Sequence, residues 1–80
     1  MDPAEKYGLS SRECQILQRV AEGGTYREIA EVLFVSESRV KALMRRICDK
    51  LEARGQTQAT AIAVAEGIIT PPAAPDESAN

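Results

Sequence analysis

The chain has 80 residues, enough for one small domain, and its formal net charge of −2 excludes a uniformly basic coat for nucleic acid. It contains no histidine, and its two cysteines, Cys14 and Cys48, form no CxxC motif, so we expect no metal, no cofactor and no disulfide. No apolar signal region or membrane-spanning run is present, which predicts a cytoplasmic protein without a membrane partner.

The first predicted helix begins at a capping box. Aromatic residues are few, one Phe and two Tyr, and no segment alternates β-branched and polar residues, so we expect helices throughout. Residues 1–8 carry no clear pattern and are expected to be a flexible N-terminal segment. Ser10 and Glu13 then have the spacing at which a hydroxyl and a carboxylate cap each other's backbone N–H groups. The helix that follows is predicted to stop at Gly23 and Gly24.

The second and third helices are separated by a short connection. Thr25 and Glu28 repeat the capping-box spacing and open a helix of about two turns. Phe34 and Val35 form a brief apolar connection, after which the hydroxyl of Ser36 can cap the next helix. A gap of about three residues is typical of a helix-turn-helix. The sequence therefore predicts an all-α, compact four-helix domain with a central helix-turn-helix.

The third helix, about residues 36–53, separates an apolar stripe from a polar, mostly basic face. Residues 39–54 hold six cations and two carboxylates, a net charge of +4, which leaves −6 for the rest of the chain. This concentration of positive charge indicates a nucleic-acid recognition helix, although charge alone fits an ordinary solvated helix equally well. The stripe comprises Val40, Leu43, Met44, Ile47 and Leu51, and the opposite face comprises Ser38, Lys41, Ala42, Arg45 and Arg46.

A fourth helix is expected from a cap at Thr57 to Glu66, with Gly67 as its stop. It is apolar around most of its circumference, more than one docking face requires, which predicts contact with another chain. The alternative is that its alanines only favour helix and are tolerated at the surface. Residues 70–80 are rich in proline and alanine and are expected to be a disordered tail.

Several short motifs recur here in the order and spacing of a known family. Over residues 9–69 the chain resembles the LuxR/GerE family. The resemblance implies a DNA-binding domain of transcription regulators, in which the third helix enters the major groove of double-stranded DNA and the fourth commonly pairs two copies. The motifs are Leu9-Ser10-x-Arg12-Glu13, Glu28-Ile29-Ala30, Val40-Lys41, Ile47-x-x-Lys50-Leu51, Thr57-x-Ala59 and Gly67-Ile68-Ile69.

The resemblance implies DNA contacts for Lys41 and Arg45, and it matches Lys50 to a lysine near the helix end. The helical face adds Arg46 as a contact to the DNA backbone. Thr25, at a helix N-terminus, is expected to offer its hydroxyl and neighbouring N–H groups to a phosphate. The remaining expected sites are Ser38, Arg39 and Ala42 on the DNA face and Ala61, Val64 and Ala65 at a homodimer interface.

Four positions depart from the residues usual in the family. Tyr26 replaces a small polar residue, Arg39 replaces Thr, Leu43 replaces His and Gln56 replaces Arg. We expect Leu43 to widen the apolar stripe. The charge of Arg39 opposes the helix dipole near the helix start, so a DNA phosphate is its expected partner. The DNA sequence preferred by this chain should differ from that of its relatives accordingly.

Two other functions compete with this interpretation. The Glu-Ile-Ala turn also resembles region 4 of bacterial sigma factors, but the fourth helix fits the LuxR/GerE ending better. A protein-interaction module that docks on RNA polymerase or another regulator is the second alternative, because of the acidic remainder of the chain. An enzyme is not expected, since histidine, a metal set and a glycine-rich phosphate loop are all missing. The chain is either a stand-alone regulator or the output domain of a larger one.

Overall fold

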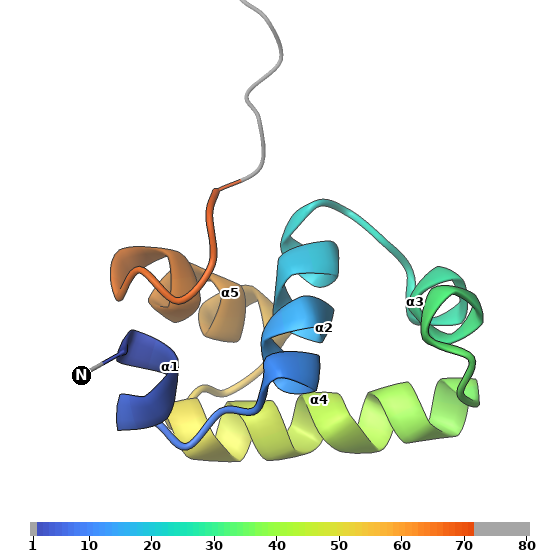
Figure 1. The fold of residues 1–80 in the computed structure, drawn as a ribbon, viewed down its shortest axis with the longest axis horizontal. Helices are drawn as coiled ribbons and strands as arrows, with labels where there is room; N and C mark the ends of the chain where they lie inside the picture. The colour runs from blue at the N-terminus through green and yellow to red at the C-terminus, as the bar shows by residue number, and fades with distance from the viewer. Residues whose placement is uncertain (1, 72–80) are drawn as a thin grey trace, which may run out of the picture.

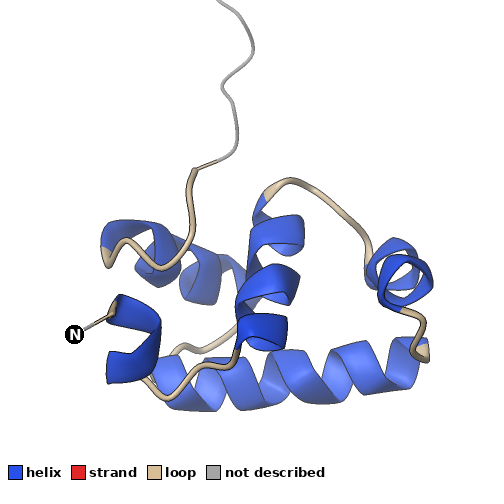
Figure 2. Ribbon diagram, viewed as in Figure 1, coloured by secondary structure: helices blue, strands red, loops and turns tan. Residues whose placement is uncertain are grey.

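A computed structural model describes residues 2–71. Within this range the chain forms helices and no strands (Figure 2), as expected for the all-α class. None of these helices is long and apolar enough to span a bilayer. The helices are α1 (Pro3–Lys6), α2 (Ser11–Ala21), α3 (Tyr26–Leu33), α4 (Glu37–Leu51) and α5 (Gln56–Ala65).

Both predicted capping boxes are present. The Ser10 hydroxyl accepts from the Glu13 N–H at 3.1 Å, and the Glu13 carboxylate accepts from the Ser10 N–H at 2.9 Å. Thr25 and Glu28 make the same reciprocal pair at the start of α3. Each box satisfies two N–H groups that have no partner inside the helix, so these residues fix where α2 and α3 begin.

The turn between α3 and α4 is as short as predicted. Phe34 ends α3 in the left-handed conformation, with φ of 58°, and the Val35 N–H returns to the Ala30 carbonyl at 3.0 Å. Ser36 then caps α4 by accepting from the Arg39 N–H at 3.0 Å. Three residues, 34–36, therefore connect the two helices, and α3 and α4 form the helix-turn-helix.

The predicted C-terminal end of α4 and the predicted N-terminal end of α5 are wrong. α4 stops at Leu51 and does not reach Ala53, because Glu52 is left-handed (φ 54°) and the Ala53 N–H bonds the Cys48 carbonyl at 2.8 Å. α5 begins at Gln56 with Gly55 at its N-cap, so Thr57 is not the cap, and no side chain caps this helix.

The N-terminal segment, expected to be flexible, contains a helical turn. The Asp2 carboxylate accepts from the Ala4 N–H at 3.0 Å, and proline occupies the first helical position. The Tyr7 hydroxyl and the Lys6 ammonium both contact the Glu66 carboxylate, at 3.0 and 3.7 Å, which ties this turn to the end of α5. An Asp-Pro pair is a helix start signal that the sequence analysis missed.

Thr70, the first residue of the predicted tail, is hydrogen-bonded to α2. The Gln18 side chain accepts from the Thr70 N–H at 3.0 Å and donates to the Thr70 carbonyl at 2.9 Å. The chain is therefore held against α2 as far as Thr70. Residues 72–80 of the predicted tail lie outside the described residues.

The core lies where α2 crosses α4, with α3 on one side of α2 and α5 on the other (Figure 1). Side chains from α2, α3 and α4 fill its centre, and Ala59 and Ala63 of α5 are fully buried against it. Because these alanine side chains are small, α5 can pack closely against α2 and α4. The whole predicted stripe of α4 is buried, including Leu43, whose replacement of a polar family residue thus extends the core. The fully buried large side chains are Ile16, Leu17, Ile29, Val40 and Ile47.

Candidate nucleic-acid interface

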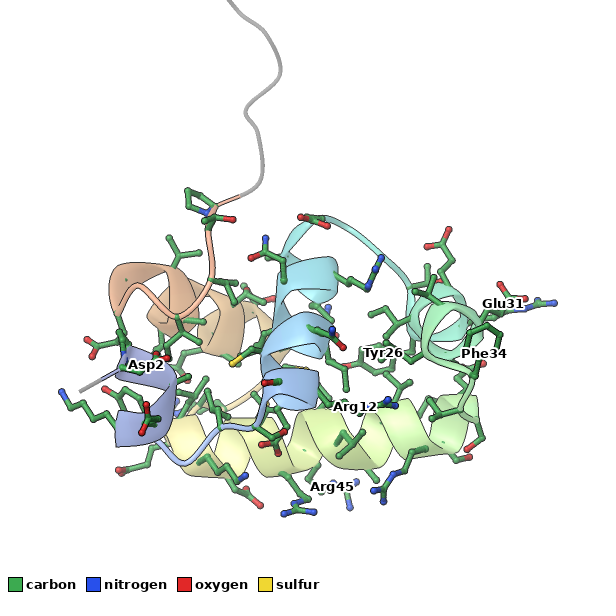
Figure 3. All side chains as sticks on the ribbon, viewed as in Figure 1. Asp2, Arg12, Tyr26, Glu31, Phe34 and Arg45 are labelled. Carbon is green, nitrogen blue, oxygen red and sulfur yellow. The ribbon has the colours of Figure 1, made fainter. Side chains whose placement is uncertain are left out.

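The face of α4 opposite the core is open to solvent. Arg45 extends from it away from the other helices (Figure 3). Because 3.6 residues make one turn, burial of the apolar stripe forces the polar set onto the opposite side of the same helix. The exposed residues of this face include Ser38, Arg39, Lys41, Ala42, Arg45 and Arg46, which are predicted DNA contacts, and also the acidic residue Asp49.

Four of these residues share one shallow hollow along the helix, lined by Ser38, Lys41, Ala42 and Arg45. Their spacing of three and four residues places them in one row. Ser38 and Ala42 are small, so a flat group can approach the helix between the two long cations. A row with small side chains at its floor and donors at its edges matches the demands of base-edge recognition in a major groove.

The cations of this face are held weakly by the protein itself. Lys41 lies 3.7 Å from the Glu37 carboxylate, but both side chains are largely exposed and such pairs contribute little. Arg39, Arg45 and Arg46 form no ion pair with any carboxylate of residues 2–71. These guanidinium groups are therefore available to an external anion.

Lys50 differs from the other predicted contacts, because its ammonium points into the protein. It lies 2.7 Å from the Glu13 carboxylate and donates to the Gly8 carbonyl at 2.8 Å. Only 3% of the Glu13 side chain and 27% of the Lys50 side chain are exposed. The end of α4 is thus tied to the start of α2, and we do not retain Lys50 among the proposed DNA contacts.

The Glu13 carboxylate is stabilised in its charged form. Burial raises the pKa of Glu13, but hydrogen bonds from Lys50 and from the Ser10 backbone outweigh burial and leave this pKa below its ordinary value. The second carboxylate oxygen of Glu13 is buried without a hydrogen-bond partner. One oxygen therefore accepts both bonds, and loss of Lys50 would leave this buried charge poorly compensated.

Thr25 is exposed at the N-terminus of α3, but its polar groups are already engaged. Its hydroxyl accepts from the Glu28 N–H and lies 3.2 Å from the Glu28 carboxylate, and its own N–H bonds the same carboxylate at 2.8 Å. The N–H groups of the first helical turn have no acceptor within a helix. A phosphate at this end would therefore meet backbone N–H groups of α3 more readily than the Thr25 hydroxyl.

The three predicted dimer residues lie near one edge of α5. Ala61 and Ala65 are exposed and Val64 is half-buried, whereas Ala59 and Ala63 face the core. The helix is therefore not buried all round in a single chain. What remains outside is a narrow strip of small apolar side chains.

Several features of the site region were not expected from the sequence. Phe34, predicted as part of an apolar connection, is 95% exposed at the tip of the turn. Tyr26 and Gln56, two of the departures from the family, form a hydrogen bond of 2.6 Å.

Cys14 and Cys48 are half-buried free thiols, and burial raises the pKa of each. No cluster of metal-ligating side chains occurs among the residues described.

Known proteins resemble this chain over most of its length. Residues 7–63 match the family of bacterial regulatory proteins, luxR family. The transcriptional regulatory protein YxjL of Bacillus subtilis (strain 168) is 45% identical over 61 residues, which cover 76% of this chain and 28% of that protein. The HTH-type quorum-sensing regulator RhlR of Pseudomonas aeruginosa is 44% identical over 61 residues, covering 76% of this chain and 25% of RhlR.

A solved structure of a transcription factor has a similar fold. The structure of the transcription factor GerE matches with a TM-score of 0.75 and 26% sequence identity, covering 78% of this chain and 92% of GerE. The arrangement of the helices is therefore shared with GerE. This chain spans about a quarter of the length of YxjL and RhlR.

Proposed function

Because the chain belongs to the luxR family of bacterial regulatory proteins, we propose that it binds double-stranded DNA sequence-specifically as part of transcription regulation. The observation that carries the proposal is the row formed by Ser38, Lys41, Ala42 and Arg45 on the open face of α4. In this role α4 enters the major groove, and its buried stripe holds it against the rest of the domain.

The individual roles follow from the donors that each side chain offers. Lys41 and Arg45 donate to base edges, with the O6 and N7 atoms of guanine as the preferred acceptors. Ala42 contacts a thymine methyl group, and Ser38 donates to or accepts from a base edge. Arg39 and Arg46, at the margins of the row, contact phosphates.

We further propose that two copies pair through α5, at Ala61, Val64 and Ala65. These residues are accessible in the single chain, and their side chains are small enough for two helices to approach closely. The available strip is narrow, so we expect pairing to be weak in solution and to be strengthened by DNA. A preferred site should then consist of two half-sites of opposite orientation, with centres about 10 base pairs apart.

Selection of binding sites from a random pool of duplex DNA tests these proposals together. An enriched motif with two symmetric halves supports both sequence-specific binding and pairing, whereas a single half-site supports only the first. Titration with random duplex DNA at low salt distinguishes DNA binding from the competing function, docking on another protein. A chain that fails to bind DNA even there would be better explained as a module that docks on RNA polymerase or another regulator.

A further inference from the structure

The first residues of α3 and α5 are joined by a hydrogen bond. The Tyr26 hydroxyl donates to the Gln56 side-chain oxygen at 2.6 Å, across 30 positions of sequence. A tyrosine hydroxyl carries its proton at neutral pH, and burial raises the pKa of Tyr26 further, so the hydroxyl is a donor here.

α3 and α5 have little other connection. α3 packs on α4 and α2, and α5 packs on α2 and α4, so the two helices lie on opposite sides of α2 (Figure 1). Among residues 2–71, the Tyr26–Gln56 bond is the one side-chain hydrogen bond between them. In Figure 3, Tyr26 lies on the side of α3 nearer to α2, and Phe34 on the opposite side.

The start of α5 has few other fixed points. Gly55 gives it no side-chain cap, and its fully buried side chains, Ala59 and Ala63, are small. Its larger side chains that pack on the core, Ile62 and Val64, lie in the second half of the helix. The Gln58 side chain accepts from the Arg54 N–H at 2.7 Å, but this contact is local. The hydrogen bond from Tyr26 is therefore a long-range side-chain contact at the first residue of α5.

The bond also lies between two surfaces of the proposed function. Thr25, Tyr26, Glu37 and Gln56, which belong to the starts of α3, α4 and α5, line a common hollow. α3 precedes the recognition helix in the helix-turn-helix, and α5 carries the exposed strip. The separation of two half-sites on DNA depends on how this strip is oriented relative to α4 in each copy.

We infer that Tyr26 and Gln56 are positioning residues that fix α5 relative to the helix-turn-helix and thereby set the half-site spacing that a pair of chains prefers. This role rests on the proposed function. Neither residue belongs to the row on α4 that is proposed to contact bases, so on this proposal the affinity for a single half-site does not depend on their hydrogen bond.

The test measures binding of the 80-residue chain to duplexes that carry two copies of its selected half-site, at centre spacings of about 8 to 14 base pairs. Tyr26→Phe removes only the hydroxyl. We expect it to reduce the preference for the selected spacing by about 2- to 12-fold, the range that one hydrogen bond supports. Its affinity for a single half-site should stay within about twofold of the parent's. Gln56→Met should match Tyr26→Phe, whereas Gln56→Glu, which keeps an acceptor, should keep the preference.

Tyr7→Phe is the matched control, because the Tyr7 hydroxyl bonds Glu66 at the other end of α5 at 3.0 Å. It should leave the spacing preference unchanged. Equal effects of the two Tyr→Phe changes, or no effect of Tyr26→Phe, would overturn the positioning role. A loss of single-half-site affinity in Tyr26→Phe would overturn it in favour of direct DNA contact. If the unmodified chain selects no duplex, the proposed function itself is wrong. If it selects only single half-sites, pairing through α5 is wrong. Either result also rules out the positioning role of Tyr26 and Gln56.

Discussion

Individual residues of α4 divide according to what their charged ends meet. Arg45 and Arg46 extend into solvent, whereas the Lys50 ammonium lies against Glu13 inside the domain. Sequence spacing alone does not distinguish these cations, because all three belong to one amphipathic helix. Their partners in the folded chain do, and two variants can test the distinction.

Arg45→Ala should weaken binding to the selected DNA site by about 1 to 3 kcal/mol, because a two-pronged contact to a base edge would be lost. It should leave the thermal unfolding midpoint nearly unchanged, since the side chain is exposed. Competition against duplexes with single base changes measures the effect. The role is wrong if affinity and base preference both remain those of the parent.

Lys50→Met should act on stability and not on the salt dependence of DNA binding. Removing the ammonium leaves the Glu13 carboxylate buried with one bond fewer, which should lower the free energy of unfolding by about 1 to 3 kcal/mol. The slope of log affinity against log salt should stay the same. Arg46→Met is the control, because loss of a phosphate contact should reduce that slope by about 1.

The stability difference between Lys50→Met and the parent should also depend on pH. The pKa of Glu13 is lower in the folded state than in the unfolded state, so its charged form stabilises the fold at pH values above the unfolded pKa. This contribution is lost as the pH falls through the lowered folded pKa. Urea unfolding at neutral and acidic pH should show the difference shrinking in acid; a difference that is constant over this range would argue against the ion pair.

At the scale of elements, the starts of α2, α3 and α4 could be predicted from the sequence, whereas those of α1 and α5 could not. Ser10, Thr25 and Ser36 were identified because a side-chain cap follows a local pattern. The end of α4 depends on Glu52 adopting a left-handed conformation. Glycine or asparagine usually signals such a residue in a sequence, and glutamate does not. The Lys50–Glu13 and Tyr26–Gln56 contacts join positions 37 and 30 residues apart, so only the tertiary arrangement reveals them.

α5 provides the prediction at this scale. Val64→Glu should lower the stability of the domain but leave it folded, because Val64 is half-buried and packs at the edge of the core. It should weaken binding to a DNA with two half-sites more than binding to one half-site. Two carboxylates brought into an apolar strip would repel each other and require desolvation. Val32→Glu on α3, also at a partly exposed valine, is a suitable control. Equal affinity of Val64→Glu and parent for the paired site would exclude α5 as the dimer contact.

For the whole molecule, the distribution of charge matters more than its sum. The net charge is −2, yet residues 39–54 carry +4, so positive charge is concentrated in α4 and the residues after it, and the rest of the chain is acidic. We expect binding to random duplex to fall steeply as salt rises, with a slope set by the few phosphates that Arg39, Arg46 and their neighbours contact in each copy. Fluorescence anisotropy across a salt series measures this slope; a flat response would contradict a phosphate-based interface.

The missing side-chain cap at Gly55 has a consequence for the order in which the domain opens. α2, α3 and α4 each begin with a capping side chain, whereas α5 begins without one and its fully buried side chains are two alanines. Its backbone amides should therefore exchange with deuterium sooner than those of α4, through local openings that leave the rest of the domain intact. If α5 joins two copies on DNA, a DNA with two half-sites should slow this exchange in α5 more than a single half-site does. Hydrogen exchange in α5, the least protected of these helices in the free chain, would then measure pairing of the two copies.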